Sequence, residues 1–184
     1  MARKIKSKKS QVWLSDYTLS MLLFILAALI AVKIIINSFS ANTDFQELKS
    51  ETSKISEILL SEGFPVNWSS GNSSDVIRPG LLTGKRLNES KVIQAMNSTY
   101  VNYTSLKTML QTKHDFAVIF QKSNNTVINF TDMCAIGKPS VSIWNGISCS
   151  APNFNNIDHK NMVQLNRLVV YNSAITRMVV YTWN

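Results

Sequence analysis

The residues best suited to chemistry are two cysteines, Cys134 and Cys149, and two histidines, His114 and His159. Neither histidine belongs to a cluster with metal-ligand spacing, and two cysteines this far apart do not form a zinc knuckle. Cys149 and His159 could form a nucleophilic pair. If the chain after residue 37 is exported, however, a disulfide is the expected state of two such cysteines; the alternative is two independent thiols. The bridge would close a loop of about 15 residues and stabilise the fold by roughly 3 kcal/mol.

The other polar residues do not form a recognisable catalytic pattern. No glycine-rich phosphate loop is present among the six glycines, and His114-Asp115 is interpreted as the polar end of a strand. The scattered acids, none with an evident general acid/base partner, are Asp75, Asp115, Asp132 and Asp158. We therefore expect neither an enzyme nor a bound metal or cofactor.

The net charge of +8 is concentrated at the N-terminus. The rest of the chain carries only about +3, without a basic stripe that includes aromatic residues, so we expect no nucleic-acid partner. Basic residues beside an apolar segment stay on the cytoplasmic side of a membrane. The five positive residues of the first ten are Arg3, Lys4, Lys6, Lys8 and Lys9.

An almost wholly apolar run extends from Tyr17 to Ile36. As a helix its twenty residues would be about 30 Å long, the thickness of a bilayer core. A removable signal peptide has an apolar core of only about 7–15 residues. The length therefore favours a retained membrane-spanning helix, with lipid as its partner and the later residues outside the cytoplasm.

Asn-X-Ser/Thr sequons agree with export, because N-glycans are added to such sequons in exported chains. Their number exceeds chance modestly, and all lie within residues 67–131. The predicted glycosylation sites are Asn67, Asn72, Asn88, Asn97, Asn102, Asn124 and Asn129.

Asp16 and Lys33 are the charges associated with the apolar run. In a lone anchor, both side chains could reach the lipid headgroups. In an assembly of packed helices, Asp16 could instead pair with a positive group of a neighbouring subunit. Both interpretations remain open at this stage.

The sequence Lys8-Lys9-Ser10 followed by Gln11-Val12-Trp13-Leu14-Ser15-Asp16 resembles the type IV pilin-like proteins of archaea. In that family a short basic leader is cut before a retained apolar helix, whose mature end often begins with Gln and has an acidic residue near its fifth position. The resemblance implies cleavage between Ser10 and Gln11 by a prepilin peptidase. Ser10 stands where the family usually has Gly or Ala, and Asp16 would be sixth.

Residues 38–63 read as a second helix or a continuation of the first. Thr43 and Gln46 have capping-box spacing, and Gly63 followed by Pro65 is a stop signal. The apolar stripe of this segment predicts packing within the chain rather than a coiled coil. Its members are Phe45, Leu48, Thr52, Ile55 and Leu59.

Residues 64–184 predict a small α+β domain. A short strand or turn is expected around Val76–Leu82. One helix is expected to be capped by Asn88 and to continue to about Met96, and another to be capped by Thr104 and to continue to about Gln111. Three β features are expected after it. They are a hairpin turning at Ser123-Asn124-Asn125, a strand VSIW followed by an Asn145-Gly146 turn, and a hairpin turning at Asn172-Ser173-Ala174.

The sequence thus predicts an α+β fold with a long N-terminal membrane and stalk helix and an antiparallel-sheet head of four to six strands. Its parts are a leader (1–10), an assembly helix (11–37), an amphipathic stalk (38–63) and an extracytoplasmic head (64–184). The resemblance implies a structural subunit of a filament or pseudopilus at the cell surface, self-associating or joining other pilin-like subunits. The alternatives are a single-pass membrane protein with an extracellular binding domain and, more remotely, a membrane-tethered enzyme.

Overall fold

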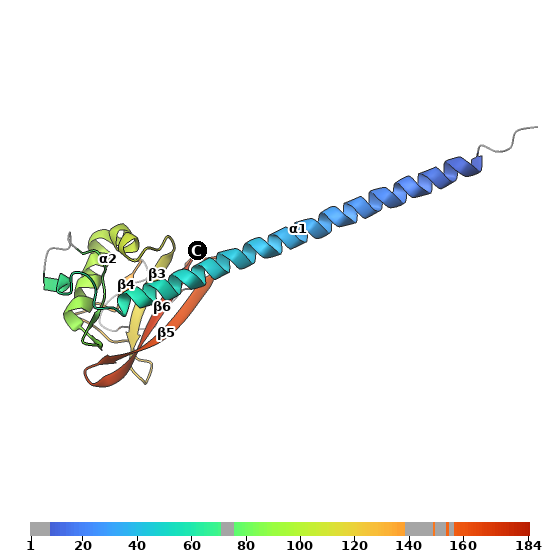
Figure 1. Ribbon diagram of the computed structural model, residues 1–184. Helices are drawn as coiled ribbons and strands as arrows, with labels where there is room; N and C mark the ends of the chain where they lie inside the picture. The colour runs from blue at the N-terminus through green and yellow to red at the C-terminus, as the bar shows by residue number, and fades with distance from the viewer. Residues whose placement is uncertain (1–7, 71–75, 139–148, 150–153, 155–156) are drawn as a thin grey trace, which may run out of the picture. The chain divides into compact units, whose positions relative to one another are not determined.

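The computed structural model describes residues 8–70, 76–138, 149, 154 and 157–184 (Figure 1). The chain divides into two units, Met1–Asp44 and Phe45–Asn184. Helix α1 (Lys8–Leu59) contributes residues to both. No helix begins at Thr43, because α1 already includes that residue, so the capping-box spacing does not mark a helix start.

Within the second unit, α1 packs through the predicted stripe. Leu48, Thr52, Ile55 and Leu59 are all buried, whereas Phe45 remains 41% exposed. The Thr52 hydroxyl donates to the Leu48 carbonyl oxygen at 2.7 Å and also contacts the Thr182 hydroxyl. The prediction that this stripe packs within the chain is therefore confirmed, except at Phe45.

The described strands form a six-stranded sheet of order β1-β2-β5-β6-β3-β4. Neighbouring strands are antiparallel apart from β2 and β5, which are parallel and pair through Arg86 and Val170. The sheet is therefore antiparallel-rich rather than purely antiparallel. The strands are β1 (Leu82–Thr83), β2 (Arg86–Leu87), β3 (Asp115–Gln121), β4 (Ala135–Gly137), β5 (Met162–Tyr171) and β6 (Ala174–Trp183).

Strand β3 shows how the two faces of the sheet are used, since successive side chains point to opposite faces. Phe116, Val118 and Phe120 join the main core, together with buried residues of α1 and of helix α2 (Glu89–Met109). On the other face, Ala117 belongs to a smaller cluster that includes Trp183, against which Phe154 packs. Both faces of β3 are thus covered, as its continuous apolar sequence requires.

The C-terminal hairpin is confirmed, although its loop has two residues rather than three. Tyr171 pairs with Ala174, and Asn172 and Ser173 have φ values of +46° and +62°. Two positive φ values define a type I′ turn, whose twist matches that of the flanking strands.

The turn expected at residues 123–125 is also present, but the chain after it forms only an isolated bridge. Lys122 donates its N–H to the Thr126 carbonyl oxygen at 2.9 Å, and Gln121 is bridged to Val127. The predicted strand at 141–144 and the Asn145-Gly146 turn lie outside the described residues.

Helix α2 replaces the two predicted helices and contains a kink at Asn102, where φ is −157° and ψ is 82°. Asn88 is the N-cap as predicted, its Oδ1 accepting from the Lys91 N–H at 3.2 Å. The second cap was predicted at Thr104, which is wrong: Asn102 Oδ1 accepts from the Ser105 N–H at 2.9 Å. Asn caps better than Thr, which explains the two-residue difference.

The chain leaves α1 through a tight turn at Gly63, whose φ is +78°. A Cβ atom here would lie 2.7 Å from the Arg78 carbonyl oxygen, so only glycine fits. Phe64 forms a bridge with Arg78, and a short 3₁₀ helix, η1 (Trp68–Ser70), follows. The short strand or turn expected around Val76–Leu82 is an isolated bridge at Arg78 followed by β1, which begins at Leu82.

Candidate functional site

The most unusual surface of the chain is the segment Ser15–Asn37 of α1. It is long and apolar enough to cross a membrane, a test that an N-terminal signal sequence would also pass. None of its side chains is buried within the structure, and Phe24 is 74% exposed. An exposed apolar surface of this size is typical of membrane or protein interaction sites.

Two of the predicted site residues, Asp16 and Lys33, lie on this segment and are exposed. No salt bridge joins either one to another residue in the described part of the chain. Ser10 and Gln11 lie within the bounds of α1, and their side chains are outside the described residues. The structure therefore places these four residues on one helix without testing the cleavage or assembly roles predicted for them.

The predicted disulfide joins Cys134 to Cys149, with a Cα–Cα distance of 5.6 Å. Cys134 is buried directly before β4, so the bridge ties the chain at Cys149 to the sheet. Since both cysteines are paired, Cys149 has no thiol for a nucleophilic pair with His159. The His159 Nδ1 instead lies 2.7 Å from the Ile157 carbonyl oxygen.

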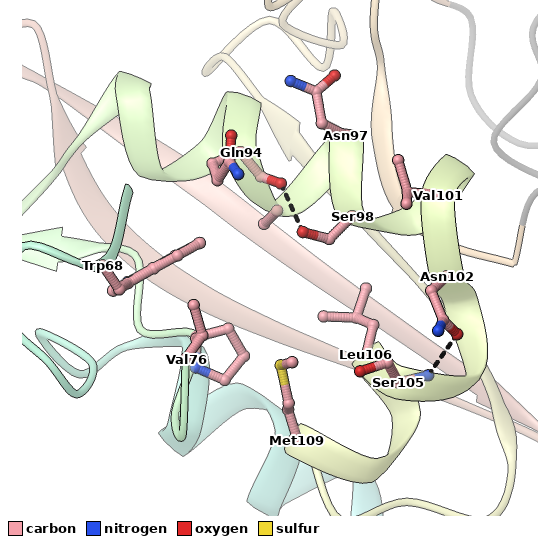
Figure 2. A pocket seen from close by; sticks show the side chains of 12 residues that line it. Trp68, Val76, Gln94, Asn97, Ser98, Val101, Asn102, Ser105, Leu106 and Met109 are labelled. Atoms are coloured by element: carbon pink, nitrogen blue, oxygen red, sulfur yellow. Dashed lines mark hydrogen bonds between the residues drawn. The ribbon is translucent and has the colours of Figure 1, made fainter. Parts of the chain in front are cut away.

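A cavity of about 300 Å³ lies in the second unit, between α2 and the loop that precedes β1. Figure 2 shows Trp68 and Val76 facing α2 across it. None of the described residues that line it is charged. The wall formed by α2 carries the amides Gln94, Asn97 and Asn102 and the hydroxyls Ser98 and Ser105.

A second polar group surrounds Asp115 at the start of β3. Its carboxylate accepts from Lys138 at 2.5 Å and Lys107 at 3.3 Å, and the Tyr103 hydroxyl donates to it at 3.2 Å. Burial raises the pKa of Asp115, but the two lysines outweigh it and hold the pKa below its usual range. Burial also raises the pKa of Tyr103, so this hydroxyl is a neutral donor.

The neighbouring residue, His114, joins the sheet to α1. Its Nδ1 lies 2.9 Å from Glu51 Oε2, which also accepts from the Thr112 hydroxyl at 2.6 Å. His114-Asp115 is thus a polar strand end, as predicted, with a partner for each side chain. Within the described residues, no three His, Cys, Asp or Glu side chains gather in a way that could hold a metal ion.

The sequons occupy different local structures. Asn88 is half-buried as the α2 cap, and Asn72 lies outside the described residues. Thr99, the hydroxyl residue of the Asn97 sequon, is 1% exposed. The remaining acceptors that are exposed are Asn67, Asn97, Asn102, Asn124 and Asn129.

Sequence reasoning missed the cavity and the ion pairs of Asp115. Lys138 is 23 residues from Asp115, and Trp68 is far in sequence from α2, so no local pattern indicates either contact. The signal that was available is the spacing of four, three, four and three residues along Val92, Met96, Thr99, Tyr103 and Leu106, which predicts a buried face on α2. Comparisons of the chain with models of protein families, with curated proteins and with solved structures found no match.

Proposed function

We propose that this chain is a structural subunit of a type IV pilus-like filament or pseudopilus, inserted in the membrane before assembly. The observation that carries the proposal is the exposed apolar segment Ser15–Asn37 with a carboxylate, Asp16, near its N-terminal end. Lipid covers such a surface before assembly, and the helices of other subunits would cover it afterwards. A filament core built in this way needs no catalytic residue.

The charge pattern supports an orientation for the subunit. The basic first ten residues favour a cytoplasmic N-terminus, which puts residues 38–184 outside. The Cys134–Cys149 disulfide and the exposed sequons suit that compartment. In this proposal the second unit is the part displayed at the cell surface.

Three measurements on cells that produce the chain test the proposal. Protease added to intact cells should remove the second unit, and N-terminal sequencing of the mature chain should begin at Gln11. Filaments sheared from the cells should contain the subunit. Protection of the second unit until lysis would contradict the orientation. A mature chain that starts at Met1 or Ala2 and is absent from every filament or complex would contradict the pilin-like role.

The second candidate is a single-pass membrane protein whose outer domain binds a ligand and never polymerises. The observation that favours it is the cavity between Trp68 and α2, since a mainly apolar cavity with a few polar groups is typical of ligand sites. An intact N-terminus and a chain that stays monomeric in the membrane would support this candidate over the first.

A further inference from the structure

The sequon Asn124-Asn125-Thr126 forms an exposed turn in which its two functional groups lie together. Asn124 Oδ1 accepts from the Thr126 hydroxyl at 2.7 Å and from the Thr126 N–H at 3.2 Å. The turn is closed by the Asn125 N–H donating to the Lys122 carbonyl oxygen at 2.9 Å. Asn125 has a φ of +64° and contacts Arg177, which fixes the turn to β6. We propose that, in the folded chain, Asn124 accepts an N-glycan ahead of Asn88 and Asn97.

The chemistry requires the amide nitrogen of the asparagine and the hydroxyl two residues later to be reachable from one side. In the transfer, Asn124 Nδ2 forms a bond to the anomeric carbon of a polyprenyl-diphosphate-linked oligosaccharide. The bond from that carbon to the diphosphate oxygen breaks, the lipid diphosphate leaves, and the amide proton passes to a base of the transferase. The Asn124 bonds described above all use Oδ1, so Nδ2 is available.

Two other sequons also fit the Asn-X-Ser/Thr pattern, but their side chains already form hydrogen bonds within the folded chain. At Asn88, Oδ1 caps the Lys91 N–H, and Nδ2 donates to the Thr83 hydroxyl at 3.1 Å. In the Asn97 sequon, the Thr99 hydroxyl donates to the Ala95 carbonyl oxygen and accepts from the Gly137 N–H, each at 3.2 Å. Modification at either place requires local opening of α2.

Asn102 and Asn129 are similar to Asn124 in their exposure. Both are exposed, as are the threonines of their sequons. Asn102 Oδ1, however, caps the Ser105 N–H within the kinked helix, and the Thr131 hydroxyl donates to the Phe130 carbonyl oxygen. Asn124 and Thr126 have local hydrogen bonds of the same kind, so the inference orders Asn124 only against Asn88 and Asn97.

In cells this inference rests on the proposed function, because the second unit must be exported to meet the donor. The experiment therefore begins in vitro, with the full folded chain in detergent micelles, an oligosaccharyltransferase and the polyprenyl-linked donor. Peptide mass spectrometry after short incubations gives the transfer rate at each sequon. The matched control is the same chain after reduction, alkylation and unfolding.

We expect Asn88 and Asn97 in the folded chain to react at least about tenfold more slowly than Asn124, because they require local opening. Unfolding should remove that difference. Thr126→Ala should abolish transfer to Asn124 and Thr126→Ser should retain it, whereas Asn88→Gln should leave Asn124 unaffected. Equal rates at Asn88 or Asn97 in the folded chain would overturn the inference, as would an unmodified Asn124 in a chain that reacts when unfolded. Transfer to Asn124 in vitro without a glycan in cells would contradict the orientation instead.

Discussion

Lys91 is a residue whose charge serves the fold rather than a site. It is 2% exposed, and its Nζ donates to the Glu62 carbonyl oxygen at 2.7 Å and the Leu82 carbonyl oxygen at 2.8 Å. Burial lowers its pKa, against the opposing charge of Glu62. The ammonium group therefore holds α2, β1 and the turn after α1 together.

Replacing Lys91 with methionine should keep the packing of the stem and leave both carbonyl oxygens without this donor. Buried acceptors left unpaired cost about 1–3 kcal/mol, so we expect Lys91→Met to lower the free energy of unfolding by about 2 kcal/mol. Urea unfolding of the full chain in detergent micelles, followed by tryptophan fluorescence, measures this. The control is Lys122→Met at an exposed position. If both substitutions change the free energy of unfolding equally, the Lys91 hydrogen bonds do not stabilise the fold as proposed.

Glu51 makes the stability of the folded state depend on pH, and the direction of this dependence follows from its pKa. Burial raises the pKa of this carboxyl, but the hydrogen bonds from Thr112 and His114 and the charge of His114 hold it below its ordinary value of 4.5. A lowered pKa in the folded state means that the folded state binds fewer protons than the unfolded one. The stabilisation by Glu51 is therefore complete above pH 4.5 and is lost as the pH falls through the lowered value.

Glu51→Gln should lower the free energy of unfolding by about 1–2 kcal/mol at neutral pH and reduce its fall on acidification. Urea titrations of both proteins between about pH 7 and about pH 3 provide the comparison. Asp115 is present in both proteins, so its own titration cancels in the difference. If the free energy of unfolding falls equally with pH in the two proteins, Glu51 does not contribute to the pH dependence of stability.

Residue roles with a local origin could be predicted from the sequence, and those that depend on distant partners could not. Asn88 caps a backbone N–H only three residues later, so the residue type and its place before a helical pattern are sufficient to predict the cap. The Glu51–His114 pair joins residues 63 apart, and its geometry exists only once α1 lies on the sheet. The disulfide was predictable because the chain has only two cysteines.

At the scale of elements, strong local patterns were again sufficient. The β5–β6 hairpin follows from two β-branched runs around residues that tolerate positive φ. The kink in α2 lies within the break predicted between two helices, but the cap residue was wrong and residues 97–101 are helical. The parallel contact of β2 with β5 was not expected, because strands of two residues carry almost no periodic signal.

The disulfide stabilises the sheet at the level of an element, since it fixes the chain at Cys149 to the start of β4. Replacing both cysteines with serine should lower the free energy of unfolding by roughly 3 kcal/mol, the loop-closure value for about 15 residues. Non-reducing peptide mass spectrometry should first show the two cysteines linked in one chain, and urea unfolding then measures the loss. Because both thiols are removed together, no free cysteine complicates the comparison. Unchanged stability would mean that the bridge constrains nothing in the unfolded chain.

At the scale of the whole molecule, the two units bury apolar surface in different ways. The second unit covers its own core from both faces of β3, whereas the apolar segment of the first is exposed along its whole length. In the two proposed functions this segment is surrounded by lipid or by other helices, and we expect Asp16 to respond differently to these two surroundings. In lipid its carboxylate can reach the headgroups; among packed helices it must be matched by a positive group.

The substitution Asp16→Ala distinguishes a helix surrounded by lipid from a helix packed against other subunits. If the helix is only an anchor, removing the carboxylate should leave membrane insertion unchanged or slightly improved. If it is an assembly element, the mutation leaves a neighbour's positive group unpaired in a low-dielectric packing, a loss large enough to reduce the assembled fraction at least about tenfold. We expect Asp16→Ala to keep its protein level and membrane location but to be depleted from sheared filaments or crosslinked complexes, with Asp16→Glu retaining more assembly because it keeps the charge. Membrane fractionation beside filament and crosslinking assays of the three proteins makes the comparison. If Asp16→Ala assembles like the unmodified chain, the carboxylate has no part in assembly and the helix is better described as a plain anchor.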